Sequence, residues 1–252
     1  MLLRADAGGV ARLTLNRPEA RNALSIGLMT ALEEAFVSIA DDPGVRVVVL
    51  AANGPAFCAG HDLRELRTDA DTQSVFAQCG RLMQRIISLP KPVIARVHGI
   101  ATAAGCQLVA TCDLAIAADT ARFATPGVNI GLFCSTPMVA LSRAVSRKSA
   151  MEMLLTGDML SAARAHEIGL INRCVPEAVL DAEVDRLAGA IAAKSPLTLA
   201  IGKEAFYRQA ELPLDEAYRY TAGVMTRNMQ TNDACEGIDA FLAKRTPVWT
   251  GT

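Results

Sequence analysis

One segment constrains the fold of this chain more than any other: residues 45–52 read VRVVVLAA. Nearly every side chain in it is apolar, and half of them are β-branched valines. A strand with one face in water alternates apolar and polar residues, whereas a continuous apolar run is typical of a strand buried on both faces. Such strands occur in parallel sheets that helices cover on both sides. The segment therefore predicts an α/β protein.

Strands and helices alternate along the first half of the chain. Apolar residues at three- or four-residue spacing predict a helix from about Leu24 to residue 40 and another over residues 75–88. The polar residues 67–74 predict a surface loop between them. The other predicted strands read VARLTL, KPVIARVHG and CDLAIAA, and AAGCQLVAT predicts a further helix. This order indicates an α/β fold with right-handed crossovers.

The pattern changes from Pro137 onward. Almost all of the remaining sequence has helical spacing, apart from one short extended piece that reads GLINRCVP. Residues 195–252 contain several helical runs and no clear strand. We expect these last helices either to cap the rest of the chain or to contact neighbouring subunits.

Composition argues against several classes of function. The chain has 252 residues, 51% of them hydrophobic, so it can bury a large core. Its net charge is −1, and because it lacks a basic stripe we expect no nucleic-acid partner. No apolar run is long enough to cross a bilayer, so we expect no membrane span. The seven cysteines lack metal-ligand spacing and suit reduced thiols, and the first residues lack a secretion signal. We therefore expect a cytoplasmic protein.

Two glycine-containing turns follow predicted buried strands. The first reads AFCAGHDLREL at residues 56–66, and the second reads HGIATAAGCQL at residues 98–108. Small residues at 103–105 let a ligand approach the start of a helix, where unpaired N–H groups carry partial positive charge. Two such turns could supply two converging N–H donors, which is the arrangement of an oxyanion hole. The alternative is ordinary close packing of a helix against a strand.

These turns are also motifs of a known family. The chain resembles the enoyl-CoA hydratase/isomerase superfamily, the crotonases, through LNRPEARNAL, AFCAGHDL, KPVIARVHGIATAAGCQLVATCDLAIAADTARFATP and FLAKRTPVW. These motifs occur in order over essentially the whole chain. The segments AAGCQLVA, FATPGVN and GLFCSTP are similar to the branch called enoyl-CoA hydratase domain-containing protein 3.

The resemblance implies a fold, a ligand and site residues. The fold is a spiral of ββα units over residues 1–194, followed by a helical region at 195–252 that contacts other subunits in a homotrimer or hexamer. The ligand is an acyl-CoA thioester of fatty-acid metabolism, with no separate cofactor and no metal. The backbone N–H groups of His61 and Ala104 form the oxyanion hole. The residues implied to flank the thioester, the pantetheine arm and the nucleotide are Arg21, Ala23, Asp62, Leu63 and Arg64. A solvated surface charge is the alternative for either arginine.

Two positions depart from the hydratase pattern. Hydratases of this family use two glutamates, one to direct a water onto the double bond and one to protonate the neighbouring carbon. The corresponding residues here are Gln107 and Gly127. An amide orients a water or a substrate but does not take its proton, and glycine only leaves space for the substrate. We therefore expect hydration to be slower by several orders of magnitude.

Other residues are candidates for the missing chemistry. Ser135 stands where some branches carry a carboxylate, but no histidine is spaced to activate it as a nucleophile. His61 is a candidate acid or base, whereas His98 is expected to be structural and His166 to lie on a helix surface. Three hypotheses stay open: an acyl-CoA enzyme that acts through an enolate, a non-catalytic acyl-CoA binder, and an acyl-CoA hydrolase or decarboxylase.

Overall fold

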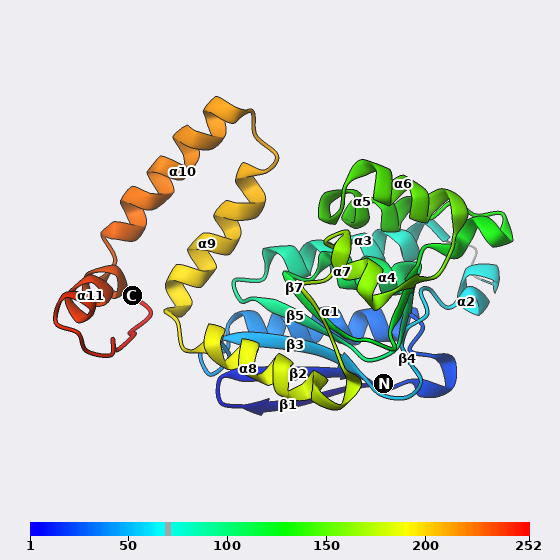
Figure 1. The fold of residues 1–252 in the computed structure, drawn as a ribbon, viewed down its shortest axis with the longest axis horizontal. Coiled ribbons are helices and arrows are strands. Elements are labelled where there is room, and N and C mark those ends of the chain that lie inside the picture. The colour runs from blue at the N-terminus through cyan, green and yellow to red at the C-terminus, as the bar shows by residue number, and fades with distance from the viewer. Residues whose placement is uncertain (69–71) are drawn as a thin grey trace.

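A six-stranded sheet forms the centre of the computed structural model, which describes residues 1–68 and 72–252 (Figure 1). β1 is antiparallel to β2, and the other neighbouring strands of this sheet are parallel. Every residue of β3 is buried, which confirms the buried strand predicted at residues 45–52. In their order across the sheet, the strands are β1 (Leu2–Ala7), β2 (Val10–Leu15), β3 (Val47–Ala52), β5 (Val93–Val97), β7 (Leu114–Ala118) and β10 (Arg173–Val175).

A second sheet consists of short strands that follow those of the first. Three times along the chain, a long strand is followed by a short strand and then by a helix, which is the predicted spiral of ββα units. The short strands are β4 (Ala56–Cys58), β6 (Ile100–Thr102), β8 (Arg122–Ala124) and β9 (Leu160–Ser161). The helices that follow β4, β6 and β8 include α2 (Leu63–Thr68), α3 (Thr72–Ser88), α4 (Ala104–Thr111) and α5 (Ser135–Ala144).

Helices cover both faces of the larger sheet, as a doubly buried strand requires. On β3, Val48 and Leu50 enter one core cluster with α1 (Ile26–Ala40) and α3, while Val47 and Val49 enter another with α8 (Leu180–Ala192). Neighbouring side chains of a strand point to opposite faces, so a continuous apolar run supplies both clusters. Two further helices, α6 (Arg147–Thr156) and α7 (Ala162–Glu167), lie on either side of β9 in the chain.

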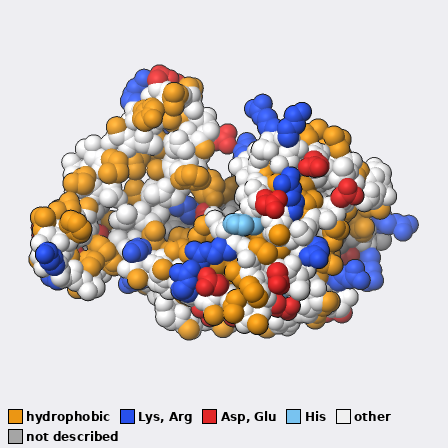
Figure 2. Space-filling view, viewed as in Figure 1, with side chains coloured by type: hydrophobic (Ala, Val, Ile, Leu, Met, Phe, Trp, Pro, Cys, Tyr) orange, Lys and Arg blue, Asp and Glu red, His pale blue; other side chains and the backbone are white. Residues whose placement is uncertain are grey.

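The last three helices extend away from the sheets (Figure 1). They are α9 (Pro196–Gln209), α10 (Leu214–Met229) and α11 (Asn232–Leu242). Lys203 of α9 anchors them, because its Nζ donates to the Asp113 carboxylate at 2.6 Å and to the carbonyl of Ile86 at 2.9 Å. Apolar side chains such as Phe206 and Phe241 are exposed on these helices (Figure 2). The domain division at residue 194 and the contact with other subunits stay predictions.

Several elements differ from the sequence-based expectations. β1 and the short strands β4, β6 and β8 were not predicted. They are defined by hydrogen bonds to neighbouring strands and not by an alternation of apolar and polar residues. The surface loop predicted at 67–74 is wrong at 67–68 and 72–74, which are helical, and residues 69–71 lie outside the described residues. Leu24 precedes α1, whose N-cap Ser25 accepts from the N–H of Leu28. In the described part of the chain, no helix combines the length and the apolar character that a membrane span needs.

Candidate functional site

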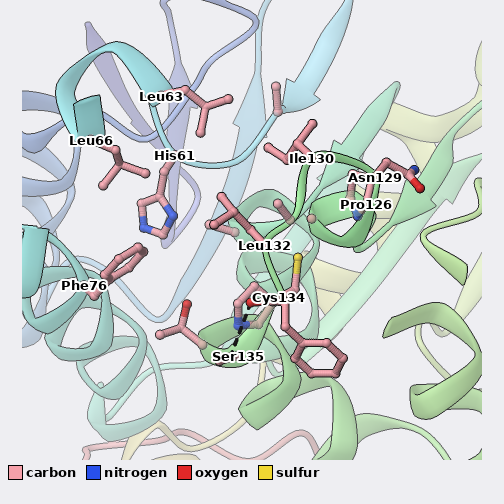
Figure 3. Close-up of a pocket in the computed structure, with 17 residues that line it drawn as sticks. His61, Leu63, Leu66, Phe76, Pro126, Asn129, Ile130, Leu132, Cys134 and Ser135 are labelled. Carbon is pink, nitrogen blue, oxygen red and sulfur yellow. Dashed lines mark hydrogen bonds between the residues drawn. The ribbon is translucent and has the colours of Figure 1, made fainter. Parts of the chain in front are cut away.

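A largely apolar cavity of about 690 Å³ opens beside the start of α4 (Figure 3). Its size is typical of a small-molecule site. One side is formed by His61, Leu63, Leu66 and Phe76. The opposite side is formed by residues of the segment 126–137, which comprises the loop before α5 and the first turn of that helix. No aspartate, glutamate, lysine or arginine is among the described residues that line it. The cavity therefore suits an uncharged, apolar part of a ligand.

The two turns predicted from the sequence meet at this cavity. Gly60 has a φ of +98°, and a Cβ on it would lie 2.9 Å from the Cβ of Ala103 and 3.3 Å from the nitrogen of Ala104. The N–H of Ala59 donates to the carbonyl of Arg21 at 3.1 Å, which ties the first turn to the segment around Arg21. The left-handed φ and the close approach both require glycine at position 60.

The second turn places the start of α4 directly against β4. A Cβ on Gly105 would lie only 2.0 Å from the carbonyl oxygen of Cys58. Ala103, the N-cap residue, has φ 49° and ψ −119°. This conformation strongly favours glycine, and in another residue it costs about 1–3 kcal/mol. The surrounding contacts thus hold a strained backbone that turns the chain sharply into α4.

His61 and Ala104 both line the cavity. Over residues 1–68 and 72–252, neither of their N–H groups donates a hydrogen bond. Ala104 is the first residue of α4, where N–H groups have no partner within the helix. Two unpaired donors beside an apolar cavity could hold a carbonyl oxygen on which negative charge develops. Their assignment as oxyanion donors stays a prediction.

The imidazole of His61 is the other polar group on this side of the cavity. Its ring packs edge-on to Phe76, with centroids 5.3 Å apart and planes at 90°. Nε2 is buried and has no hydrogen-bond partner in the described chain. Burial lowers the pKa of the ring from 6.5 to about 4. His61 is therefore neutral near pH 7.

Comparison with known proteins shows the family of this chain. The sequence profile of the enoyl-CoA hydratase/isomerase family matches residues 5–252. The chain belongs to this family. It is 49% identical to enoyl-CoA hydratase domain-containing protein 3, mitochondrial, of Xenopus laevis, over 96% of this chain and 83% of that protein. The human protein of the same name is 47% identical, over 96% and 81%.

Solved structures of the family agree with the fold. A crystal structure of an enoyl-CoA hydratase from Mycobacterium smegmatis has 54% identity and a TM-score of 0.96, covering 98% of both chains. That of human enoyl-CoA hydratase domain-containing protein 3 has 46% identity and a TM-score of 0.96, covering 98% of this chain and 99% of the other. These matches confirm the crotonase fold and the predicted branch.

The expected cytoplasmic location is contradicted by the same relatives. The proteins of this branch from Xenopus laevis, human, mouse and zebrafish are all named as mitochondrial. Five of the seven cysteines are buried free thiols, as expected. Reduced thiols, however, indicate a reducing environment rather than one particular compartment, so this signal could not separate the two locations.

Gln107 and Gly127, which the resemblance matches to the two hydratase glutamates, lie in different surroundings. Gln107 is only 5% exposed and is not one of the residues that line the cavity; its Oε1 accepts from the thiol of Cys79 on α3 at 3.9 Å. Gly127 does line the cavity, but a Cβ on it would lie 2.5 Å from the carbonyl oxygen of Leu132 and 2.9 Å from the Sγ of Cys134. The family's second carboxylate therefore does not fit at position 127 while this loop keeps its shape.

Ser135 and Cys134 line the cavity but show no sign of activation. The Ser135 hydroxyl donates to the carbonyl of Phe133 at 3.3 Å. Burial raises the pKa of the Cys134 thiol, which keeps it protonated near neutral pH. No histidine, aspartate or glutamate among the described residues is hydrogen-bonded to either side chain. Nothing in these contacts supports a nucleophile.

Asp62 is engaged in the scaffold, although the resemblance places it beside the thioester. Its carboxylate accepts from Nη2 of Arg17 at 2.8 Å and from the N–H of Arg64 at 3.1 Å. Burial alone would raise the pKa of Asp62, but these two bonds hold it below the ordinary value. Leu63, the next residue, lines the cavity, and Ala23 is buried.

Asn22 holds the first turn in place and was missed in the sequence. It is fully buried with φ 53°, and its Nδ2 donates to the carbonyls of Asn53 and Ala56 at 2.8 Å each. Its Oδ1 accepts from the N–H of Arg17 at 2.8 Å. Arg21, which precedes it, is exposed and also left-handed, at φ 50°. Asparagine tolerates this conformation, so the RN pair of LNRPEARNAL was the available signal.

The remaining histidines lie outside the cavity. Nε2 of His98 is 2.7 Å from the carbonyl oxygen of Gly54, in agreement with a structural role. His166 is exposed on α7, as expected for a helix surface. In the described residues there is no group of three or more histidine, cysteine, aspartate or glutamate side chains that could hold a metal ion.

Proposed function

We propose that this chain binds acyl-CoA or enoyl-CoA thioesters and stabilises the enolate form of the bound thioester. The observation that carries the proposal is the pair of unpaired N–H groups, at His61 and Ala104, beside an apolar cavity. A carbonyl oxygen between the two donors gains negative charge when the neighbouring carbon loses a proton, and each donor then contributes about 2.7–4 kcal/mol. The acyl chain occupies the apolar part of the cavity, and Arg21 and Arg64 contact the phosphates.

Efficient hydration is not part of this proposal. Gln107 is an amide turned toward Cys79, and a side chain at position 127 meets the backbone of Leu132. Hydration therefore lacks both carboxylates that would activate the water and supply the proton. A non-catalytic acyl-CoA binder stays the alternative, and it differs from the proposal only in whether bound thioesters react.

Isotope-edited infrared spectroscopy tests the oxyanion assignment directly. Octanoyl-CoA labelled with ¹³C at the thioester carbonyl is bound to the chain, and the carbonyl band is compared with that of free ligand. Two N–H donors polarise the carbonyl, so the band moves to lower frequency on binding. Ala104→Pro removes one of the two donors, the N–H at the first position of α4, and the shift becomes smaller in this variant.

Three results separate the possible functions. Binding with a shifted carbonyl band supports the proposal, whereas binding with an unshifted band contradicts the oxyanion assignment. Crotonyl-CoA and octenoyl-CoA are assayed in parallel for loss of the conjugated double bond. Fast hydration by the unaltered chain would contradict the inference drawn from Gln107 and Gly127. Release of free coenzyme A, or of carbon dioxide from a carboxylated acyl-CoA, would favour the hydrolase or the decarboxylase instead.

A further inference from the structure

Among the described residues that line the cavity, one side chain can accept a proton near neutral pH. Among the described residues that line it, His61 and Cys134 are the titratable ones. The thiol of Cys134 is held in its protonated form by burial. A neutral imidazole always keeps one nitrogen lone pair, whereas the serine, threonine and asparagine side chains in the lining are not bases. The imidazole of His61 is thus the remaining candidate.

The two ring nitrogens of His61 lie in different surroundings. Nε2 is buried without a partner on the side of Phe76. Nδ1 has no hydrogen bond within the described chain, yet it is not among the buried unpaired atoms, so it reaches open space. Figure 3 shows a ring nitrogen of His61 facing the cavity, toward Leu132 and Cys134. With its proton on Nε2, the ring presents the lone pair of Nδ1 to the cavity.

The position of this ring is tied to the position of the thioester. His61 supplies one of the two N–H groups that hold the carbonyl oxygen in the proposed function, and its own side chain lines the same cavity. The carbon next to the carbonyl is one bond from the carbonyl carbon. In the proposed function, one residue would therefore carry both the oxyanion donor and a base within the same cavity.

We propose that the imidazole of His61 removes and returns a proton at the carbon next to the thioester carbonyl. The inference rests on the proposed function, since the enolate must be held by the two N–H groups. The C–H bond breaks, its proton goes to Nδ1, and its electron pair forms the enolate double bond as the carbonyl oxygen becomes the oxyanion. In the reverse step the enolate carbon takes a proton back from the imidazolium, and no oxidant or co-reactant is needed.

The proton affinity of the ring suits this task. Burial brings the pKa of His61 to about 4, which is close to that of an ordinary glutamate side chain. A ring with this pKa is neutral near pH 7 and keeps a lone pair that can accept the proton. Proton transfer would then take place at the turn that carries the oxyanion donors, because position 127 has no room for a side chain.

Hydrogen–deuterium exchange measures this step without any net reaction. Octanoyl-CoA is incubated with the chain in deuterated water, and loss of its C2 protons is followed by proton NMR. The unaltered chain is expected to exchange them, and His61→Gln, which keeps the backbone N–H, to exchange them at least about 10²-fold more slowly. His166→Gln is the matched control on the surface of α7 and leaves the rate unchanged. Calorimetry with octanoyl-CoA is expected to give dissociation constants within about threefold for all three proteins.

A second variant separates proton transfer from a structural role. His61→Ala leaves a space where the ring was, and imidazole added to the buffer is expected to restore exchange in proportion to its concentration. Exchange by His61→Gln at the rate of the unaltered chain would overturn the inference. Binding without exchange by the unaltered chain would overturn it as well and leave the proposed function standing. Absence of octanoyl-CoA binding would overturn the proposed function itself.

Discussion

The two walls of the cavity are built in different ways. On the turn wall, formed by residues 59–61 and 103–105, backbone contacts fix the groups that face the cavity, such as the close approach of Gly105 to Cys58. On the loop wall, formed by residues 126–134, side chains determine what the ligand meets, and none of them is a carboxylate. An N–H group persists through any substitution except proline, whereas a carboxylate is lost in a single change. The turn wall can thus keep its chemistry even when the side chains of the loop wall change.

The turn wall should tolerate substitution far less than ordinary helical positions do. In Gly105→Ala, the new Cβ would lie 2.0 Å from the carbonyl oxygen of Cys58. This oxygen belongs to the backbone, so it cannot move aside as a flexible side chain would. We expect the free energy of unfolding to fall by about 3 kcal/mol, the upper end for overpacking. Urea denaturation measures it. Gly80→Ala on α3, where a Cβ meets nothing within 4 Å, is the control and should gain about 0.5–1 kcal/mol. Equal effects at the two positions would show that the contact is absent.

His61 gives the turn wall a pH dependence in the acid range, where Cys134 of the loop wall does not titrate. Burial lowers its pKa from 6.5 to about 4, so the unfolded chain binds this proton more readily than the folded chain. The stability associated with the neutral ring is complete above pH 6.5 and is lost as the pH falls toward 4. We expect a loss of about 2 kcal/mol between pH 7 and 4.5, after a discount for partial exposure of the ring.

Comparison of two proteins isolates this contribution from all other titrating groups. The glutamine in His61→Gln does not titrate. The free energy of unfolding of the unaltered chain, relative to that of His61→Gln, should therefore fall by about 2 kcal/mol between pH 7 and 4.5. Urea denaturation at pH 7, 5.5 and 4.5 measures that difference. A difference that stays constant over this range would contradict the lowered pKa.

The contrast between the walls also explains what the sequence could reveal. The buried run at residues 45–52 predicted the doubly covered sheet, because burial on both faces is a property of the strand's own side chains. The turns of the turn wall were predicted from local sequence too, since the small residues at 103–105 are recognisable from residue type alone. The short strands β4, β6 and β8 were not, because three residues carry no period and only their partners define them.

Side-chain direction was the part that the sequence could not supply. The sequence predicted Gln107 as a residue that orients a water or a substrate, but not that its amide would lie against Cys79 of α3, a residue 28 positions away. The crowding around Gly127 likewise depends on how the loop returns at Leu132 and Cys134. Both facts arise from contacts between distant segments, which a pattern of residue types does not contain.

The loop wall can be tested for the crowding that excludes a carboxylate. Gly127→Ala adds a Cβ 2.5 Å from the carbonyl oxygen of Leu132, and we expect a loss of about 1–2 kcal/mol, less than at Gly105 because a loop adjusts more readily than a helix against a strand. Thermal unfolding compares it with Gly189→Ala, where a Cβ meets nothing within 4 Å. A Gly127→Ala protein as stable as the unaltered chain would mean that a side chain does fit there. The inference that a carboxylate side chain is excluded from position 127 would then fail.

The smallest expected effect concerns the strain at Ala103, and its sign is opposite. Ala103→Gly gives the residue that φ 49° and ψ −119° favour, which relieves about 1–3 kcal/mol of strain. Because glycine has greater conformational freedom in the unfolded chain, the substitution also lowers the free energy of unfolding by about 0.5–1 kcal/mol. We therefore expect a net gain of about 1 kcal/mol by urea denaturation, with octanoyl-CoA binding unchanged because the N–H of Ala104 is untouched. Ala110→Gly, inside α4, should instead lose about 1 kcal/mol. If both variants lose stability alike, Ala103 is unstrained, and the start of α4 is held by its contacts alone.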